Sequence, residues 1–195
     1  FELVWYDQTL PPVRPDGRLP QGRVFPAITG CVSSRANWDP RATPCMVFGK
    51  GGLAYEINGH NDAGQVCIDG YGEPLIVDLG GYHIDQGGSP TLGLTSAHNV
   101  LMFDGENMRR DRPLARAMYN APERRLKPAL KSIFLQHEFD DRRGGFWTLD
   151  TSEIYDGVDL VRRTVVHLNP GIVIVQDTAV LPRERVVSLR WHTAD

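Results

Sequence analysis

Two apolar runs flank a short glycine-containing turn in the stretch Gly64-Gln65-Val66-Cys67-Ile68-Asp69-Gly70-Tyr71-Gly72-Glu73-Pro74-Leu75-Ile76-Val77-Asp78. Short runs rich in valine and isoleucine, bounded by glycine and aspartate, are typical of paired β-strands. If Tyr71 and Gly72 form the turn, residue 65 lies roughly opposite residue 78. The stretch therefore predicts an antiparallel hairpin with strands at 64–71 and 73–78.

Comparable runs continue on both sides of this hairpin. The 20 glycines and 14 prolines favour many turns over long helices, and only residues 113–119 hint at a helix. A second hairpin turn is predicted at Asn169-Pro170-Gly171. The other predicted strands are 29–36, 44–50, 52–57, 98–104, 131–139, 145–154, 160–168, 171–179 and 185–192. This number of short antiparallel strands predicts an all-β fold, either a two-sheet β-sandwich or a barrel.

The first part of the chain differs from the rest. Residues 1–26 show little periodicity, and we expect them to form a linker that docks onto another domain, with Trp5 and Tyr6 as anchors. Its prolines are Pro11, Pro12, Pro15, Pro20 and Pro26. Residues 27–195 are expected to form the β-domain. Because the sequence begins at Phe1 and stops inside a predicted strand, we expect it to be a piece of a longer protein with a truncated sandwich.

Composition excludes several classes of function. A net charge of −3 and a pI near 6.1 give no support to nucleic-acid binding. The longest apolar runs, such as residues 171–175, are too short to span a membrane. The three cysteines have no CxxC spacing and suit small apolar core residues better than a disulfide framework. No GxSxG, P-loop or dinucleotide-binding glycine pattern is present.

Three metal-capable residues fall at predicted strand ends. His60 precedes the first strand of the hairpin, Asp78 ends the second, and His98 opens the strand 98–104 after a glycine-rich loop. Two imidazoles and a carboxylate, with a fourth position for water, suit zinc, and added oxygen ligands would suit other divalent ions. Asn61, Asp62 and Asn99 could orient the imidazoles. The spacing matches no short metal motif, so loop-capping histidines are the alternative. His83 is a weaker candidate, and His137 and His167 are expected to be ordinary strand residues.

The segment 106–129 is basic, with seven arginine or lysine residues against three acidic ones. One interpretation is a solvated excursion between strands. The other is a rim that attracts an anionic substrate, because arginine matches carboxylate and sulfate geometry.

At these residues the chain resembles the C-terminal domain of the heparinase II/III-like polysaccharide lyases. The resemblance covers about residues 1–110 by motif and the rest by strand pattern. The matching segments are Leu3-Val4-Trp5-Tyr6-Asp7, Ser33-Ser34-Arg35-Ala36-Asn37-Trp38-Asp39, His60-Asn61-Asp62-Ala63-Gly64, 71–80, Ala97-His98-Asn99 and Phe103-Asp104-Gly105.

The resemblance implies a fold, a metal and a reaction. The family joins an N-terminal (α/α) toroid, absent from this sequence, to an antiparallel two-sheet β-sandwich. Its metal ligands fall on His60, Asp78 and His98, with zinc the first choice. Its reaction is β-elimination on a uronate-containing polysaccharide, in which a base removes the proton α to the carboxylate and an acid protonates the leaving oxygen. A bacterial periplasmic or secreted location is implied.

Two residues bear on whether this chain is catalytic. Tyr82 follows Asp78 in a loop, where its phenol could reach the cleft; simple aromatic packing is the alternative. Many relatives have His-x-His where this chain has Asn58-Gly59-His60, and Asn58 can bind a carboxylate but cannot transfer a proton. We expect Asn58 either to bind substrate or to mark altered or lost activity. Without the helical domain, which carries the family's other tyrosine and its charge-neutralising asparagine, we expect no cleavage.

Two other functions compete with the lyase. The first is a non-catalytic carbohydrate-binding or structural sandwich. The second, ranked last, is a cupin-like metal enzyme, because histidine and aspartate ligands on a β-barrel also suit oxygen chemistry. The usual cupin spacing of two close histidines and a glutamate is missing here.

Overall fold

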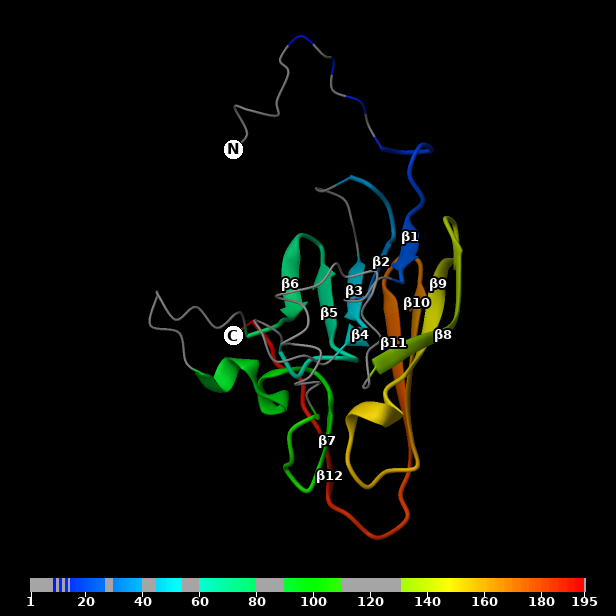
Figure 1. Ribbon diagram of the computed structural model, residues 1–195. Helices are drawn as coiled ribbons and strands as arrows, with labels where there is room; N and C mark the ends of the chain where they lie inside the picture. Colours follow the sequence, from blue (N-terminus) through cyan, green and yellow to red (C-terminus); the bar gives the residue numbers. More distant parts are fainter. Residues whose placement is uncertain are drawn as a thin grey trace.

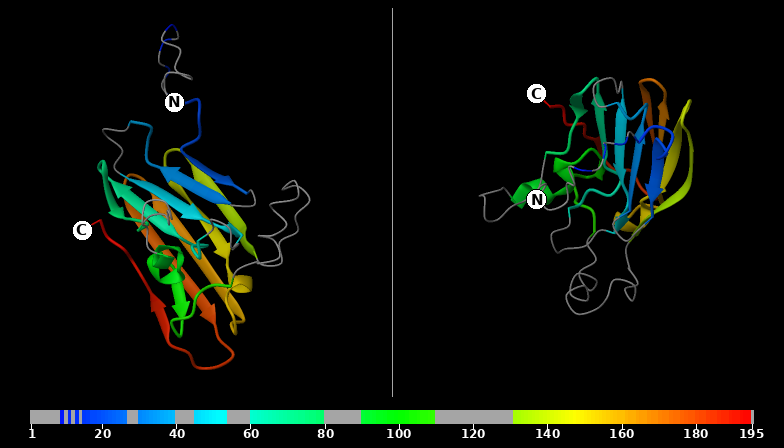
Figure 2. Two further views of the ribbon diagram at one scale, coloured as in Figure 1. Left: turned by 60° about the vertical axis from the view of Figure 1, so that its left-hand side comes forward. Right: turned by 90° about the horizontal axis from the view of Figure 1, so that it is seen from above.

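The computed structural model describes residues 9, 11, 13, 15–26, 30–39, 45–53, 60–79, 90–109 and 131–194. In this part of the chain all paired strands are antiparallel, and two five-stranded sheets form two layers (Figure 2). No α-helix occurs in it, and no helix there is long and apolar enough to cross a membrane. The predicted all-β antiparallel sandwich is confirmed. The hint of a helix at 113–119 lies outside the described residues.

The first sheet has the strand order β1-β2-β3-β5-β6 (Figure 1). Its strands are β1 (Gly22–Phe25), β2 (Cys31–Arg35), β3 (Met46–Lys50), β5 (Val66–Gly70) and β6 (Glu73–Ile76). Alternate residues are buried, so that Val24, Val32, Gly49 and Val66 form one row across four strands. The intervening side chains lie on the outer face of the sheet.

The second sheet has the order β11-β10-β9-β8-β4, and a third sheet pairs two short strands. The bounds are β4 (Gly52–Leu53), β8 (Lys131–Asp140), β9 (Gly144–Asp150), β10 (Leu160–Leu168), β11 (Ile172–Val180), β7 (Leu101–Phe103) and β12 (Val187–Leu189). The short 3₁₀ helices are η2 (Pro90–Gly93), η3 (Thr95–Ala97) and η5 (Ser152–Ile154).

Both predicted hairpin turns are present. Tyr71 and Gly72 have φ values of 56° and 85°, the left-handed backbone that a two-residue hairpin turn requires. Residues 168 and 172 pair on either side of the second turn. A bulge between Ile68 and Asp69 moves the first hairpin's register by one residue beyond the turn. As a result, Ile68 pairs with Ile76. Strand β6 ends at Ile76, two residues before Asp78.

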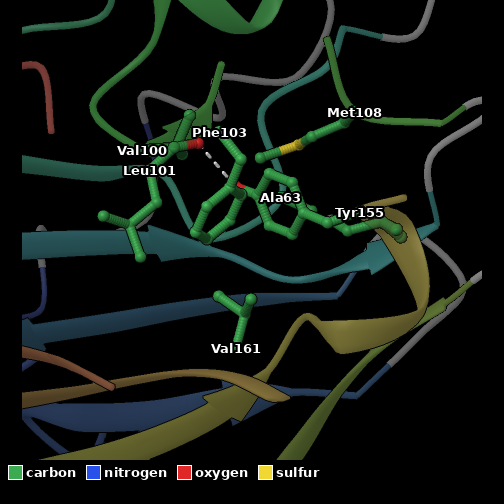
Figure 3. Packing of buried hydrophobic residues seen from close by; sticks show 8 residues of the cluster. Ala63, Val100, Leu101, Phe103, Met108, Tyr155 and Val161 are labelled. Carbon is green, nitrogen blue, oxygen red and sulfur yellow. Dashed lines mark hydrogen bonds between the residues drawn. The ribbon is translucent and has the colours of Figure 1, made fainter. Parts of the chain in front are cut away.

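The core lies between the two sheets and continues beneath the third. The inter-sheet cluster comprises Val24, Val32, Cys45, Val47, Val66, Trp147 and Val165. A second cluster packs around β7 (Figure 3). There the Phe103 and Tyr155 rings meet edge to face at 5.0 Å, and the Tyr155 hydroxyl donates to the Leu101 carbonyl at 2.8 Å. The two clusters fix both the sandwich and the loops beside it.

Several predicted strand bounds were wrong for local reasons. The strand expected at 98–104 has only residues 101–103, because the backbone N–H and C=O of Asn99 bond to the side chains of Gln65 and Arg163 instead of to a strand. The strand expected at 145–154 ends at Asp150, whose carboxylate accepts from the backbone and hydroxyl of Ser152 and starts η5. Strand β1 lies inside residues 1–26 and pairs along its whole length with β2.

Candidate metal centre

The candidate metal centre lies where the outer face of the first sheet meets the loop that carries His98. Lys50 ends β3 on the outer face, and the Lys50 backbone N–H donates to the Gln65 carbonyl at 2.9 Å. The Gly64 N–H donates back to the Lys50 carbonyl at 2.7 Å. These bonds hold the 60–65 loop against the end of β3 and so position His60 and Asp62.

His98 is the most buried member of this group, with 0% of its surface exposed. Its Nδ1 lies 3.3 Å from Asp78 Oδ2, but neither ring nitrogen makes a hydrogen bond with a described residue. Buried polar groups normally have a partner, because leaving one unsatisfied costs about 1–3 kcal/mol. A metal-binding histidine offers one such ring nitrogen to the metal, and its other nitrogen donates to a group such as the neighbouring Asp78 carboxylate.

His60 faces His98, with 5.2 Å between the ring centroids. Ligand atoms of His60, Asp62 and His98 all lie within 4.8 Å of one another. Burial lowers the pKa of His60, against the opposing effect of Asp62, so its imidazole is neutral at pH 7 and available to a metal. Lys50 Nζ contacts both carboxylate oxygens of Asp62, at 2.6 and 2.5 Å. The negative charge of Asp62 is therefore partly neutralised by the Lys50 ammonium group.

The Asp78 carboxylate is held by a side-chain network. Gln65 Nε2 donates to Asp78 Oδ2 at 3.0 Å, and Gln65 Oε1 accepts the Asn99 backbone N–H at 2.5 Å. The Asn99 amide donates to the carbonyls of Val66 and Val77, both at 2.9 Å, so it joins the two strands of the hairpin. Gln65 and Asn99 thus orient the carboxylate relative to His98.

A buried arginine of the second sheet supports the same loops from below. Arg163 is 4% exposed and forms a bidentate ion pair with Asp177, with both contacts at 2.8 Å. Its Nη1 also donates to the carbonyls of Gly64 and Asn99, at 2.7 and 2.5 Å. One side chain therefore ties the His60 loop and the His98 loop to β10.

The residues present fit a divalent metal. Two imidazoles with one or two carboxylates are a donor set that suits zinc. The unsatisfied nitrogens of His98 fit the same conclusion. Chemically, the cluster can bind a metal and hold three chain segments together.

Comparison with known proteins places the chain in a family. The model of the heparinase II/III-like C-terminal domain matches residues 45–195. The chain belongs to this heparinase II/III-like family. The predicted resemblance is confirmed, although the matched region begins after the first motifs that suggested it. No curated protein matches the sequence.

Solved structures of heparinase-type lyases share the fold. The heparan sulfate lyase HepC from Pedobacter heparinus has a TM-score of 0.69 at 15% identity over 91% of this chain. The heparinase III product of BT4657 has a TM-score of 0.67 at 14% identity over 92%. Another heparinase III has a TM-score of 0.65 at 15% identity over 92%. The chain spans about a quarter of each: 25%, 26% and 26%.

The predicted site residues divide into two groups. His98 lies beside both His60 and Asp78, but the group whose ligand atoms all lie within 4.8 Å of one another contains Asp62 and not Asp78; metal binding by His60, Asp78 and His98 stays a prediction. Tyr82 and Asn58, predicted to act in catalysis, lie outside the described residues. So do His83 and residues 110–130 of the basic segment. Among the other histidines, His137 is exposed, and His167 is buried with its Nδ1 2.8 Å from Ser34 Oγ.

Sequence reasoning missed Gln65, Lys50 and Arg163. Arg163 carried a detectable signal, because it occupies the same alternate positions of β10 as Val161, Val165 and His167, all of them buried. A charged residue at an inward position predicts a buried partner. Gln65 and Lys50 carried no such signal, since both lie at strand ends, where polar residues are common.

Proposed function

We propose that this chain is part of a polysaccharide lyase that cleaves uronate-containing polysaccharide by β-elimination, with this domain supplying a metal site and one wall of the cleft. The observation that carries the proposal is the fully buried His98, with two unsatisfied ring nitrogens beside Asp78 and His60. Membership of the heparinase II/III-like family supports the lyase chemistry.

In this proposal His60, Asp78 and His98 hold zinc. Zinc bound there would join the segments that carry the three residues and stabilise this wall of the cleft. Gln65 keeps the Asp78 carboxylate directed at His98, and Arg163 fixes the carbonyls of Gly64 and Asn99. Asp62 is a second carboxylate within reach, although its pairing with Lys50 competes for its charge.

Proton transfer and substrate binding are assigned from the sequence. The Tyr82 phenol takes part in removing the proton α to the uronate carboxylate or in protonating the leaving oxygen. Asn58 donates a hydrogen bond to the substrate carboxylate. The remaining groups come from the family's helical domain, which is the proposed partner of this one. We assign the protein to the periplasm or exterior of a bacterium by its resemblance to the family.

Metal content tests the site. We expect about one zinc ion per chain, lost when His60 or His98 is replaced by Ala, because each replacement removes a ligand. At free zinc 100-fold above Kd, the loss lowers the free energy of unfolding by about 2.7 kcal/mol. Elemental mass spectrometry and thermal melts measure both effects. The exposed His137→Ala variant is the control, and it should retain metal and melting temperature.

A pair of isosteric variants decides between the two carboxylates. Asp78→Asn should release the metal, while Asp62→Asn should retain most of it. The reverse result would transfer the ligand role to Asp62. Full metal and unchanged melting in both histidine variants would refute the site.

An elimination assay tests the reaction. We expect this chain alone to give no unsaturated uronate from alginate or heparan sulfate, because the helical domain supplies essential groups. A protein that joins it to that domain should give a product that absorbs in the ultraviolet. Product formed by this chain alone would contradict the division of roles.

The alternative function is a non-catalytic carbohydrate-binding sandwich, and the observation in its favour is Asn58 in place of the family's first histidine. In the two-domain protein, this alternative predicts that the polysaccharide is retained but not cleaved. The same assay therefore separates the two functions.

A further inference from the structure

A second cationic feature lies on the outer face of the first sheet, where β1 and β2 pair. It is a groove with a volume of about 240 Å³. Arg23, Ser33 and Arg35 line its floor, and Trp38 and the segment 19–21 border it. None of these lining residues is acidic, although the chain as a whole carries a net charge of −3. The groove therefore concentrates positive charge on an otherwise acidic protein.

Both guanidinium groups in the groove are held by aromatic rings and not by carboxylates. The Arg35 guanidinium lies 3.9 Å from the centre of the Trp38 ring, and the Arg23 guanidinium lies 5.2 Å from that of Phe25. Neither forms an ion pair with a described residue. Stacking on a ring leaves the in-plane N–H donors of arginine available, and these donors match carboxylate and sulfate geometry.

The tryptophan that positions Arg35 is itself fixed. Trp38 Nε1 donates to the Leu19 carbonyl at 3.1 Å, and the Asn37 side chain accepts the Asp39 N–H at 2.9 Å in a tight turn. The groove is therefore built before a ligand arrives. A site that is already ordered loses less conformational entropy on binding.

The groove lies on the same face of the sheet as the candidate metal centre. The register aligns Arg23, Ser33, Phe48 and Cys67 in one outward row across β1, β2, β3 and β5. Cys67 Sγ accepts from Gln65 Nε2 at 3.6 Å, and the same amide holds Asp78. Three strand spacings, about 14 Å, separate the two ends of the row. This is further than one sugar unit spans, so only an extended saccharide could reach both.

We propose that Arg23 and Arg35 form a binding subsite for the carboxylate or sulfate of an anionic saccharide, at the far end of the outer face from the metal centre. The subsite rests on the proposed function, because it takes the same polysaccharide further along its chain. It binds substrate and performs no chemistry.

Oligosaccharide binding tests the subsite separately from the metal and the reaction. Calorimetric titrations with alginate and heparan sulfate oligosaccharides are made on the unmodified chain and on an Arg23→Gln, Arg35→Gln double variant. The control is an Arg142→Gln, Arg162→Gln double variant, which removes the same charge from exposed positions on the second sheet. All three are repeated in the His98→Ala background, and a neutral malto-oligosaccharide tests the need for charge.

The groove variant should weaken binding about tenfold or more, because it removes two sets of charge-assisted hydrogen bonds. The control should change the affinity less than about twofold, and His98→Ala should leave the effect of the groove variant intact. If the double variant does not fold, Arg23→Gln alone, at an exposed position, should weaken binding at least threefold, since it removes about half of these bonds. Equal losses in the groove and control variants, equal binding of the neutral sugar, or no binding to the unmodified chain would overturn the subsite. None of these results depends on metal content or cleavage.

Discussion

Replacing Arg163 with Met should lower the free energy of unfolding by about 3–5 kcal/mol, since it leaves a buried carboxylate without its partner. The Asp177 side chain is only 14% exposed, and both of its carboxylate oxygens accept hydrogen bonds from the Arg163 guanidinium. The carbonyls of Gly64 and Asn99 lose a donor at the same time. Chemical denaturation at pH 7 measures the loss.

The neighbouring residue supplies a matched control for this prediction. Arg162 also pairs with an aspartate, Asp150, but its side chain is 47% exposed. Arg162→Met should therefore change the free energy of unfolding by less than about 1 kcal/mol. Equal effects of the two variants would show that burial does not govern the Arg163 contribution.

A double variant separates the ion pair from the backbone contacts. Replacing Arg163 with Met and Asp177 with Leu removes the stranded charge, and buried pairs exchanged for apolar residues are often neutral in stability. Here recovery should be partial, because the Gly64 and Asn99 carbonyls still lack a donor. Full recovery would mean that these carbonyls find other partners when the arginine is lost.

The sandwich was predictable because most of its strands have a recognisable local sequence pattern. Alternating valines and isoleucines mark buried faces, and Tyr71-Gly72 marks a turn whose backbone conformation suits few other residue pairs. The bulge at Ile68–Asp69 was not predicted from the sequence. Strand β1 was not predicted from the sequence, because only one of its four residues, Val24, is buried and the strand has no clear apolar alternation.

The candidate site was predictable in its ligands but not in its supports. The predicted ligands are metal-capable residues at predicted strand ends, namely His60, Asp78 and His98. Gln65 supports Asp78, and Arg163 supports both loops, through bonds between residues up to 99 positions apart. Such contacts follow from the meeting of the two sheets, which no local pattern encodes. The same holds for the groove, whose arginines belong to adjacent strands.

The inter-sheet core gives the second large effect. Trp147 on β9 is 2% exposed and packs with Val32, Val47 and Val165 between the sheets. Gly49 on β3 makes room for this packing, since a Cβ at Gly49 would lie 2.7 Å from Val32 Cγ1 and 3.0 Å from the indole ring. Trp147→Ala should lower the free energy of unfolding by about 3–5 kcal/mol, through lost burial and the cavity left behind. Urea denaturation measures the change.

Trp191 provides the comparison that separates burial from residue type. It is 37% exposed, and the Arg163 guanidinium lies 5.6 Å from the centre of its ring. Trp191→Ala should cost about 1 kcal/mol. If Trp147→Ala lowers the free energy of unfolding by no more than Trp191→Ala does, the two sheets must close over the cavity. They would do so at Gly49, which has no side chain to obstruct their approach.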